Sequence, residues 1–347
     1  MKTLKWIAGI ALMGIFSLTS CQSEVDEVQG ENPNTNTANS TTANNLKRVS
    51  MYDGTSDDFI DDSSCSSIKF PFTAIVNGVE LTFVSQLSYE SAINILGALN
   101  NDDDSVKIQF PITIKMSDYT EVTVTSQSQY DAIIDDCDEA EDDGKDPISA
   151  LDIDFPITVL TYDASLVQTG SVTFTSEKQL FTYIQGMSNS EYFSVKYPVN
   201  VTLADGSTME INSDLELKAS ITTALNIEEA MDEAEDDKED LETILVNGTF
   251  KVNSYLNAGV DSTNNYLGAT IDFANDWKVK SLNALTTIAT GTYTVTSDTN
   301  VYLQMSFAGS TDFSLFNKTW KVTSFTASTI TLESKTNSAI KLVLKQI

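Results

Sequence analysis

The sequence predicts an α+β protein in which two domains, each made of two ββα units, are followed by a small all-β barrel. Three observations support this prediction. Four of the six prolines follow an aromatic residue at intervals near 40 residues, which is typical of repeated supersecondary structure. Each proline lies in an alternating strand pattern that leads to a serine and then to a helical pattern. From Leu245 onward the helical pattern ends and short strands rich in Thr and Val follow.

The chain begins with the layout of a bacterial lipoprotein signal. Lys2 and Lys5 precede an apolar run over residues 6–18, which is too short to cross a bilayer comfortably. The motif Leu18-Thr19-Ser20-Cys21 closes this run. We therefore expect residues 1–20 to be a signal peptide and Cys21 to carry the lipid that attaches the protein to a membrane. An uncleaved anchor helix and a plain signal peptide are the alternatives.

Residues 21–64 are predicted to form a disordered, acidic tether. Residues 22–46 are rich in Asn, Thr, Ser and acids and offer almost nothing to bury, and the polar stretch 53–62 prolongs them. The segment Gln22-Ser23-Glu24-Val25-Asp26-Glu27 resembles the acidic segment behind the lipidated cysteine of Bacteroidota surface lipoproteins. This resemblance implies a lipid-anchored protein of the outer membrane that is exposed at the cell surface.

The aromatic-proline pairs lie within the first strand of each ββα unit. In the second unit, large apolar side chains alternate with polar ones from Val106 to Met116, the period of a half-buried strand. Because proline gives no amide hydrogen to a neighbouring strand, we expect the proline strands at sheet edges. Each domain is then one four-stranded antiparallel sheet, ordered 1-2-4-3, with both helices on one face. The four pairs are Phe70-Pro71, Phe110-Pro111, Phe155-Pro156 and Tyr197-Pro198.

Three of the four predicted helices begin with a capping box. Ser126, Ser176 and Ser213 are each followed three residues later by Gln or Glu, whose side chain can return a hydrogen bond to the helix start. The identical sequence DEAEDD ends the second unit at residues 138–143 and the fourth at 232–237. The domains are therefore predicted to be pairs of units, at 65–145 and 148–244.

The two DEAEDD segments are interpreted as solvated helix ends. They lack the alternating oxygen ligands and the closing glutamate of a helix-loop-helix calcium site. A run of like charges is more often a solvated face. Whether these segments bind cations is left open.

Cys65 and Cys137 are predicted to form a disulfide. They are the two cysteines that remain once Cys21 is lipidated, and an even pair in an oxidising compartment usually bonds. Counting from the aromatic-proline pair makes Cys65 equivalent to Ala150, and counting from DEAEDD makes Cys137 equivalent to Met231. Both thiols are thus replaced by apolar residues in the second domain. Two buried free thiols are the alternative.

Residues 245–347 are predicted to form about eight short strands of a barrel or sandwich. The residues Leu245-Val246-Asn247-Gly248-Thr249-Phe250-Lys251-Val252, Gly291-Thr292-Tyr293 and Thr319-Trp320-Lys321-Val322 resemble the lipocalin-like domains that end many Bacteroidota lipoproteins. An eight-stranded barrel can hold one small ligand. The aromatic residues that could line it are Trp277, Tyr293, Phe307 and Trp320, although aromatics at strand spacing are more often ordinary core.

Composition excludes several classes of function. The formal net charge is −30, and Arg48 is the sole arginine, so nucleic acid is not an expected partner. The chain has no histidine, which removes Ser-His and Cys-His nucleophile pairs and the usual zinc sites. No nucleotide-binding motif is present. We expect no cofactor, no metal site and no catalytic residue. A carboxylate-pair glycosidase has no specific support, since 50 acidic residues always supply a pair.

The sequence therefore predicts a non-catalytic, lipid-anchored lipoprotein of the cell envelope that displays repeat and barrel modules for binding or adhesion. Its partner is the membrane through the N-terminal lipid, together with an unidentified protein, glycan or apolar ligand. The alternative function is a carrier that binds a small apolar ligand inside the C-terminal barrel. An open apolar cavity in the barrel favours the carrier, and a filled interior favours display.

Overall fold

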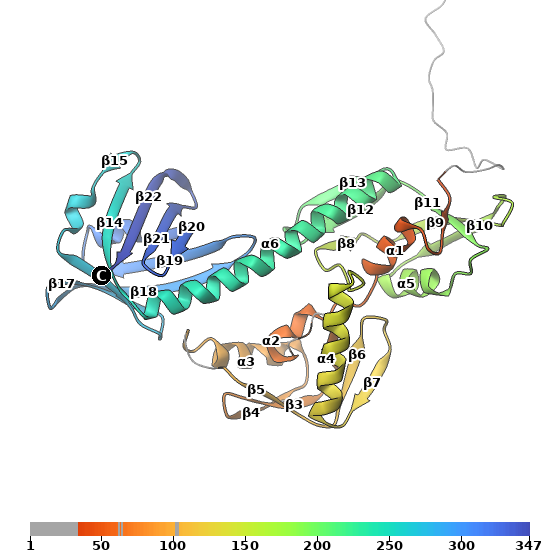
Figure 1. The fold of residues 1–347 in the computed structure, drawn as a ribbon, viewed down its shortest axis with the longest axis horizontal. Helices are drawn as coiled ribbons and strands as arrows, with labels where there is room; N and C mark the ends of the chain where they lie inside the picture. Colours follow the sequence, from red (N-terminus) through yellow and green to blue (C-terminus); the bar gives the residue numbers. More distant parts are fainter. Residues whose placement is uncertain (1–33, 62, 64, 101–103) are drawn as a thin grey trace, which may run out of the picture.

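A computed structural model describes residues 34–347 except 62, 64 and 101–103 (Figure 1). The fold is α+β, and its buried side chains form three cores. We call the units around these cores repeat pair 1 (mainly residues 65–145), repeat pair 2 (mainly residues 148–227) and the C-terminal barrel (mainly residues 249–346). The long helix α6 (Asp214–Val246) runs from repeat pair 2 to the barrel, and repeat pair 1 lies beside its length. Cys21, the predicted lipidation site, lies outside the described residues.

Each repeat pair contains two small antiparallel sheets. In repeat pair 1, one sheet has the strand order β4 (Val79–Phe83), β3 (Phe72–Val76), β5 (Val106–Gln109). The other sheet has the order β2 (Ser66–Ile68), β6 (Ile112–Met116), β7 (Glu121–Val124). In repeat pair 2, β9 (Ile157–Tyr162) lies between β11 (Tyr192–Val195) and β10 (Gln168–Phe174) in one sheet. In the other sheet, β12 (Val199–Leu203) lies between β13 (Thr208–Ile211) and β8 (Leu151–Ile153). The central strands of the two repeat pairs are therefore β3, β6, β9 and β12.

The predicted four-stranded sheet with the order 1-2-4-3 is wrong, because every proline strand divides at its proline. The half before the proline in one unit pairs with the half after the proline in the other unit, as β2 does with β6 and β5 with β3. Proline has no amide hydrogen, so the ladder stops there and the two halves enter different sheets. The peptide bonds before all four prolines are cis. Since the proline itself lies outside the ladder, the half that follows it can be central.

The helices begin where the capping serines predict. The main helix of each unit is α3 (Tyr89–Leu96), α4 (Gln127–Asp142), α5 (Glu177–Gly186) or α6. The Ser126 hydroxyl accepts a hydrogen bond from the Gln129 amide at 3.4 Å. The Gln129 side chain accepts the amide of Thr125, one residue before the serine, at 2.9 Å. In the first unit a 3₁₀ turn, η2 (Gln86–Ser88), precedes the helix.

Helix α6 does not end at its DEAEDD segment. Residues 232–237 lie inside the helix, which continues to Val246. The prediction of a helix end is therefore wrong for this copy, while α4 does end at Asp142 within the equivalent segment. The reason is tertiary packing: Ala234, Leu241 and Leu245 are buried in the core of the barrel. The second half of α6 thus belongs to the barrel unit.

The predicted tether is structured from residue 34 onward. Helix α1 (Thr41–Arg48) follows the short strand β1 (Asn36–Thr37), which pairs with β11. Ala43, Leu46 and Val49 of this segment are buried in the core of repeat pair 2. The following 3₁₀ turn η1 (Thr55–Asp57) and helix α2 (Asp58–Asp61) pack on repeat pair 1 through Ile60. Disorder was expected because apolar residues are few, but the few that exist share one face.

The C-terminal unit is a closed eight-stranded antiparallel barrel, in which sequential strands are neighbours and β14 pairs with β22 to close the sheet. Its wall strands are β14 (Thr249–Asn257), β16 (Ala269–Phe273), β17 (Lys278–Asn283), β18 (Thr286–Ser297), β19 (Val301–Ala308), β20 (Lys318–Thr326), β21 (Thr329–Ser334) and β22 (Asn337–Gln346). The short strand β15 (Val260–Asp261) and the 3₁₀ turns η3 (Thr263–Tyr266) and η4 (Phe313–Phe316) lie between them. The sequence pattern predicts separate strands at 284–289 and 291–297, but these residues form the single strand β18. It predicts a strand or a hairpin at 328–346, and these residues form the hairpin of β21 and β22. Within residues 34–347, gaps excepted, no helix is both long enough and apolar enough to cross a membrane.

Candidate binding cleft

Three of the four aromatic residues predicted to line a ligand site form the packed core of the barrel. Tyr293, Phe307 and Trp320 are almost completely buried. Phe316 packs against both Phe307 and Trp320, with ring centroids 6.5 and 6.2 Å apart, and against Tyr266 at 4.8 Å. These edge and stacked contacts are typical of aromatic cores. The four residues therefore do not surround a common open space.

Trp277 instead lies where the barrel meets repeat pair 1. Its indole Nε1 donates a hydrogen bond to the carbonyl oxygen of Gly97, just after α3, at 2.9 Å. The side-chain amide of Asn100 donates to the Tyr293 hydroxyl, and the Asn100 backbone N–H donates to the carbonyl of Asn275 at 3.1 Å. Trp277 has φ +62°, an unusual backbone conformation for a bulky residue. Strained residues of this kind cluster at functional sites.

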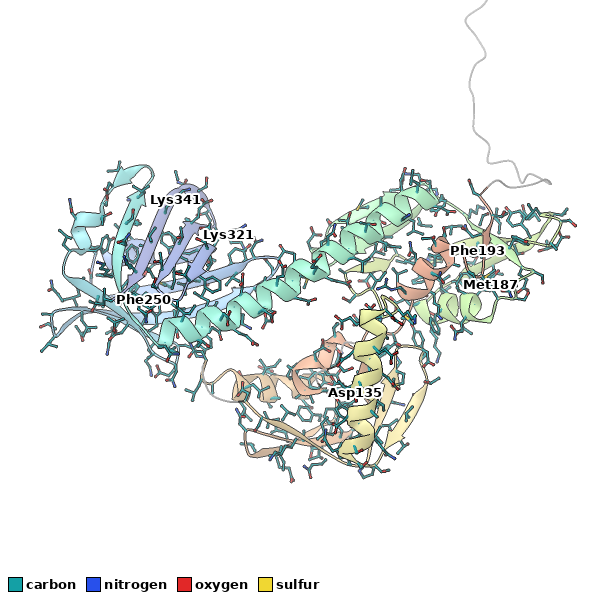
Figure 2. The ribbon with its side chains drawn as sticks, in the orientation of Figure 1. Asp135, Met187, Phe193, Phe250, Lys321 and Lys341 are labelled. Atoms are coloured by element: carbon teal, nitrogen blue, oxygen red, sulfur yellow. A yellow bond between two sulfur atoms is a disulfide. The ribbon has the colours of Figure 1, made fainter. Side chains whose placement is uncertain are left out.

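A cleft of about 1400 Å³ lies beside this junction. One wall comes from α2, α3 and the first half of α4, and the other comes from α6 and the barrel. Figure 2 labels Asp135 on the α4 wall. The lining combines apolar side chains with carboxylates. The apolar group includes Phe59, Ile93, Leu96, Ile134 and Trp277, and the acidic group includes Asp58, Asp61, Asp131, Asp135, Glu239 and Glu242.

Glu242 is the most unusual group in the cleft lining. Glu242 is only 9% exposed, and its Oε1 atom has no hydrogen-bond partner. Burial raises the pKa of Glu242 to about 7, although Lys238 one helical turn away opposes the shift. Lys238 is already paired with Glu235. A buried carboxylate without a partner is costly once ionised, so this residue is not explained by stability.

A second buried carboxylate lies behind the α2 wall. Asp57 accepts hydrogen bonds from the Ile68 amide at 2.9 Å and from the Tyr89 hydroxyl at 3.2 Å. Burial raises the pKa of Asp57 to about 6, because desolvation outweighs these hydrogen bonds. Burial, and then the charge of Asp57, raise the pKa of Tyr89. Asp57 ties η1 to β2 and so fixes α2, which supplies Asp58 and Asp61 to the cleft.

Cys65 and Cys137 form a disulfide, with Cα atoms 5.8 Å apart, that joins the start of β2 to α4. The predicted equivalence of Cys137 with Met231 is wrong, because Met231 is 41% exposed on α6. Counting from the capping serines instead makes Cys137 equivalent to Ala224, which is fully buried in the same core as Ala150. The bond holds the end of α4 that lies beyond the cleft.

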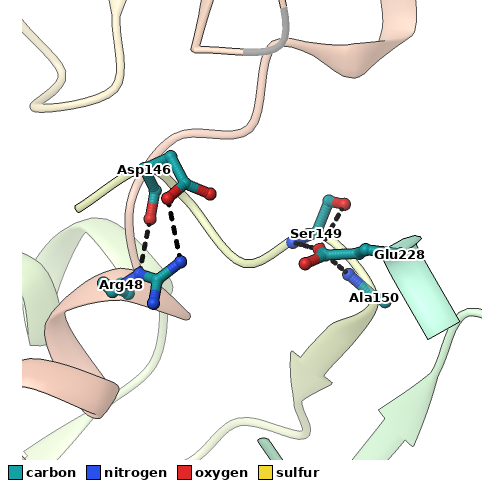
Figure 3. Close-up of polar contacts among 5 residues, drawn as sticks. All are labelled: Arg48, Asp146, Ser149, Ala150 and Glu228. Carbon is teal, nitrogen blue, oxygen red and sulfur yellow. Dashed lines mark hydrogen bonds and ion pairs between the residues drawn. The ribbon is translucent and has the colours of Figure 1, made fainter. Parts of the chain in front are cut away.

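A polar junction joins the N-terminal segment to the linker between the two repeat pairs, and the residues after this linker to α6 (Figure 3). The Arg48 guanidinium donates to the Asp146 backbone carbonyl at 2.8 Å and to its carboxylate at 2.9 Å. On α6, the Glu228 carboxylate accepts the amides of Ser149 and Ala150, at 2.5 and 2.8 Å. Arg48 stood out in the sequence as the sole arginine, but nothing there indicated its partner.

The cleft can bind and orient a ligand, but the described residues contain no group of three or more His, Cys, Asp or Glu side chains arranged to hold a metal ion. Sequence reasoning missed the cleft because its walls come from three units. The one sequence signal was Trp277, which was assigned to the barrel interior.

No family model, no curated protein and no solved structure matches this chain.

Proposed function

We propose that this protein is a non-catalytic lipoprotein, anchored in the outer membrane by a lipid on Cys21 and exposed at the cell surface, that presents its repeat and barrel modules for binding. The observation that carries the proposal is the cleft between repeat pair 1, α6 and the barrel, a concave site lined by both apolar side chains and carboxylates. The lipid anchor rests on the signal-like sequence that ends at Cys21.

The filled barrel interior supports display over the carrier function. Trp320, Tyr255, Tyr293, Phe250 and Phe316 have less than 2% of their surface exposed and belong to one continuous core. A carrier of the lipocalin type needs an enclosed space that its ligand fills. Here the ring of Phe316 and its neighbours occupy that region. The barrel is therefore better suited to form one rigid wall of the cleft.

The anchor is tested by metabolic labelling with a radioactive fatty acid in a bacterium that processes lipoproteins. The wild-type chain is expected to incorporate label, and Cys21→Ser is expected to incorporate none. Protease treatment of intact cells should digest the labelled protein if it faces outward. Labelling of Cys21→Ser, or protection of the wild type in intact cells, contradicts this part of the proposal.

Binding is tested with the immobilised full chain and separate fractions of envelope protein, polysaccharide and lipid. Asp135→Lys reverses a charge at an exposed cleft position, and Asp136→Lys makes the same change at a neighbouring position that does not line the cleft. We expect capture of one fraction to fall in the first variant and persist in the second. Saturable changes in tryptophan emission on adding fatty acids, unaffected by either variant, would instead support the carrier function.

A further inference from the structure

We propose that the cleft binds a small aliphatic polyamine, whose ammonium group pairs with the carboxylate of Glu242. The inference rests on the proposed function in using the same cleft as the binding site, and it goes further by naming the chemical class of the ligand. Three features lead to it: a buried carboxylate without a partner, a strongly acidic rim and apolar walls next to both.

The first feature is the state of Glu242. It lines the cleft, is more than nine-tenths buried, and its Oε1 atom has no hydrogen-bond donor. Glu242 takes part in no ion pair among the described residues. The nearby basic side chain, Lys238, pairs with Glu235 instead. A buried ionised carboxylate is stabilised by a cation in contact with it. The missing partner is therefore a positive hydrogen-bond donor.

The second feature is the negative charge of the cleft lining. Asp131, Asp135 and Glu239 lie at exposed positions of its lining, and Lys238 is the one basic residue there within the described chain. Such a rim attracts a cation and raises its local concentration. A neutral glycan would leave the charge of Glu242 uncompensated, and an anionic ligand would be repelled.

The third feature favours an alkylammonium ion over a metal ion as the ligand of the cleft. The described carboxylates include no group of three that could hold a metal. Ile93, Leu96 and Ile134 instead provide apolar surface beside the acids, and Trp277 adds an aromatic ring. Methylene chains pack on apolar walls, and ammonium groups are attracted to indole faces. A flexible chain with several ammonium groups matches both kinds of surface.

The test is calorimetric titration of spermidine into the full chain at about pH 8, where Glu242 is ionised in the free protein. We expect saturable binding in the wild type and a loss of roughly tenfold or more in affinity for Glu242→Gln. Asp240→Asn removes one charge from the same helix outside the cleft, so its affinity should change by less than about twofold. Glu242→Gln keeps the shape of the side chain and removes an unpaired charge, so it should fold.

A second pair of variants makes the result independent of Glu242. Asp135→Lys should weaken spermidine binding, whereas Asp136→Lys should leave it nearly unchanged. Equal losses in all four variants would show that only overall charge matters and would overturn the proposal. So would the absence of spermidine binding, or equally tight binding of Mg²⁺ at the same site. If spermidine fails while envelope capture still depends on Asp135, the polyamine is wrong but the proposed binding function stands.

Discussion

Replacing Glu242 by Gln should stabilise the barrel unit at neutral and alkaline pH. The pKa of Glu242 is raised from 4.5 to about 7 by burial. In the folded protein the carboxyl is therefore protonated more readily than in the unfolded chain, and it contributes no penalty below about pH 4.5. As the pH rises from 4.5 to about 7, the unfolded chain loses this proton while the folded protein keeps it, so stability falls, and the loss is complete above about pH 7. The shift corresponds to about 3 kcal/mol at alkaline pH.

The charged and titratable groups that act on Glu242 are Lys238, which opposes the shift, and Glu235 and Glu239, which add to it. From the barrel, Tyr293 lies within electrostatic range, since the charge of Glu242 contributes to the raised pKa of Tyr293. Since neutral Gln has the same shape as protonated Glu, it avoids the ionisation cost at every pH. The variant should exceed the wild type in free energy of unfolding by about 3 kcal/mol at about pH 8 and match it near pH 4.

The assay is urea unfolding at both pH values, followed by tryptophan emission. Trp320 lies in the barrel core against which α6 packs, and Trp277 lies on the same unit, so emission reports the unit that holds Glu242. Asp240→Asn, an exposed change on the same helix at a residue that does not contribute to the pKa shift of Glu242, is the control and should shift the free energy by less than about 0.5 kcal/mol. Equal stability of Glu242→Gln and wild type at about pH 8 would refute the reasoning.

Three further predictions concern the elements that hold the cleft walls. Replacing Cys65 and Cys137 by Ala should lower the free energy of unfolding of repeat pair 1 by about 4 kcal/mol, the chain-entropy value for a loop of 72 residues; an unchanged urea midpoint by circular dichroism would contradict it. Arg48→Met leaves the half-buried Asp146 without its partner and should cost about 1.5–3 kcal/mol, with faster amide exchange in α1; wild-type exchange would count against the polar junction. Asp57→Asn should remove the part of the pH dependence in which stability falls between pH 3.8 and about 6, amounting to about 3 kcal/mol; an identical pH profile in both proteins would disprove it.

Local features of the fold were predictable from the sequence because they depend on neighbouring residues. The serine at 126 and the glutamine three residues later specify a helix start through bonds within one turn. The regular short strands likewise predicted an all-β unit of about eight strands, a barrel or a sandwich, although the boundary between two of its strands was wrong. Cys65 and Cys137 were the remaining cysteines, so their pairing needed no knowledge of the sheets.

The sheet topology was not predictable in the same way. Alternation continues through Phe110-Pro111, so one long strand was expected, but the ladder on each side belongs to a different sheet. The segment at 41–49 looked disordered because its apolar residues are sparse, and only the core of repeat pair 2 gives them a partner. The cleft depends on contacts between units, such as Trp277 with Gly97, which no local pattern encodes.

The central claim is that binding takes place in the cleft and not inside the barrel. Hydrogen–deuterium exchange tests it most directly, with the full chain compared alone and in the presence of the envelope fraction that it captures. We predict added protection in residues 93–100 of repeat pair 1, 127–135 of α4 and 238–243 of α6, the segments that line the cleft. Protection confined to the barrel strands β19 and β20, with those three segments unchanged, would contradict the account and favour a carrier.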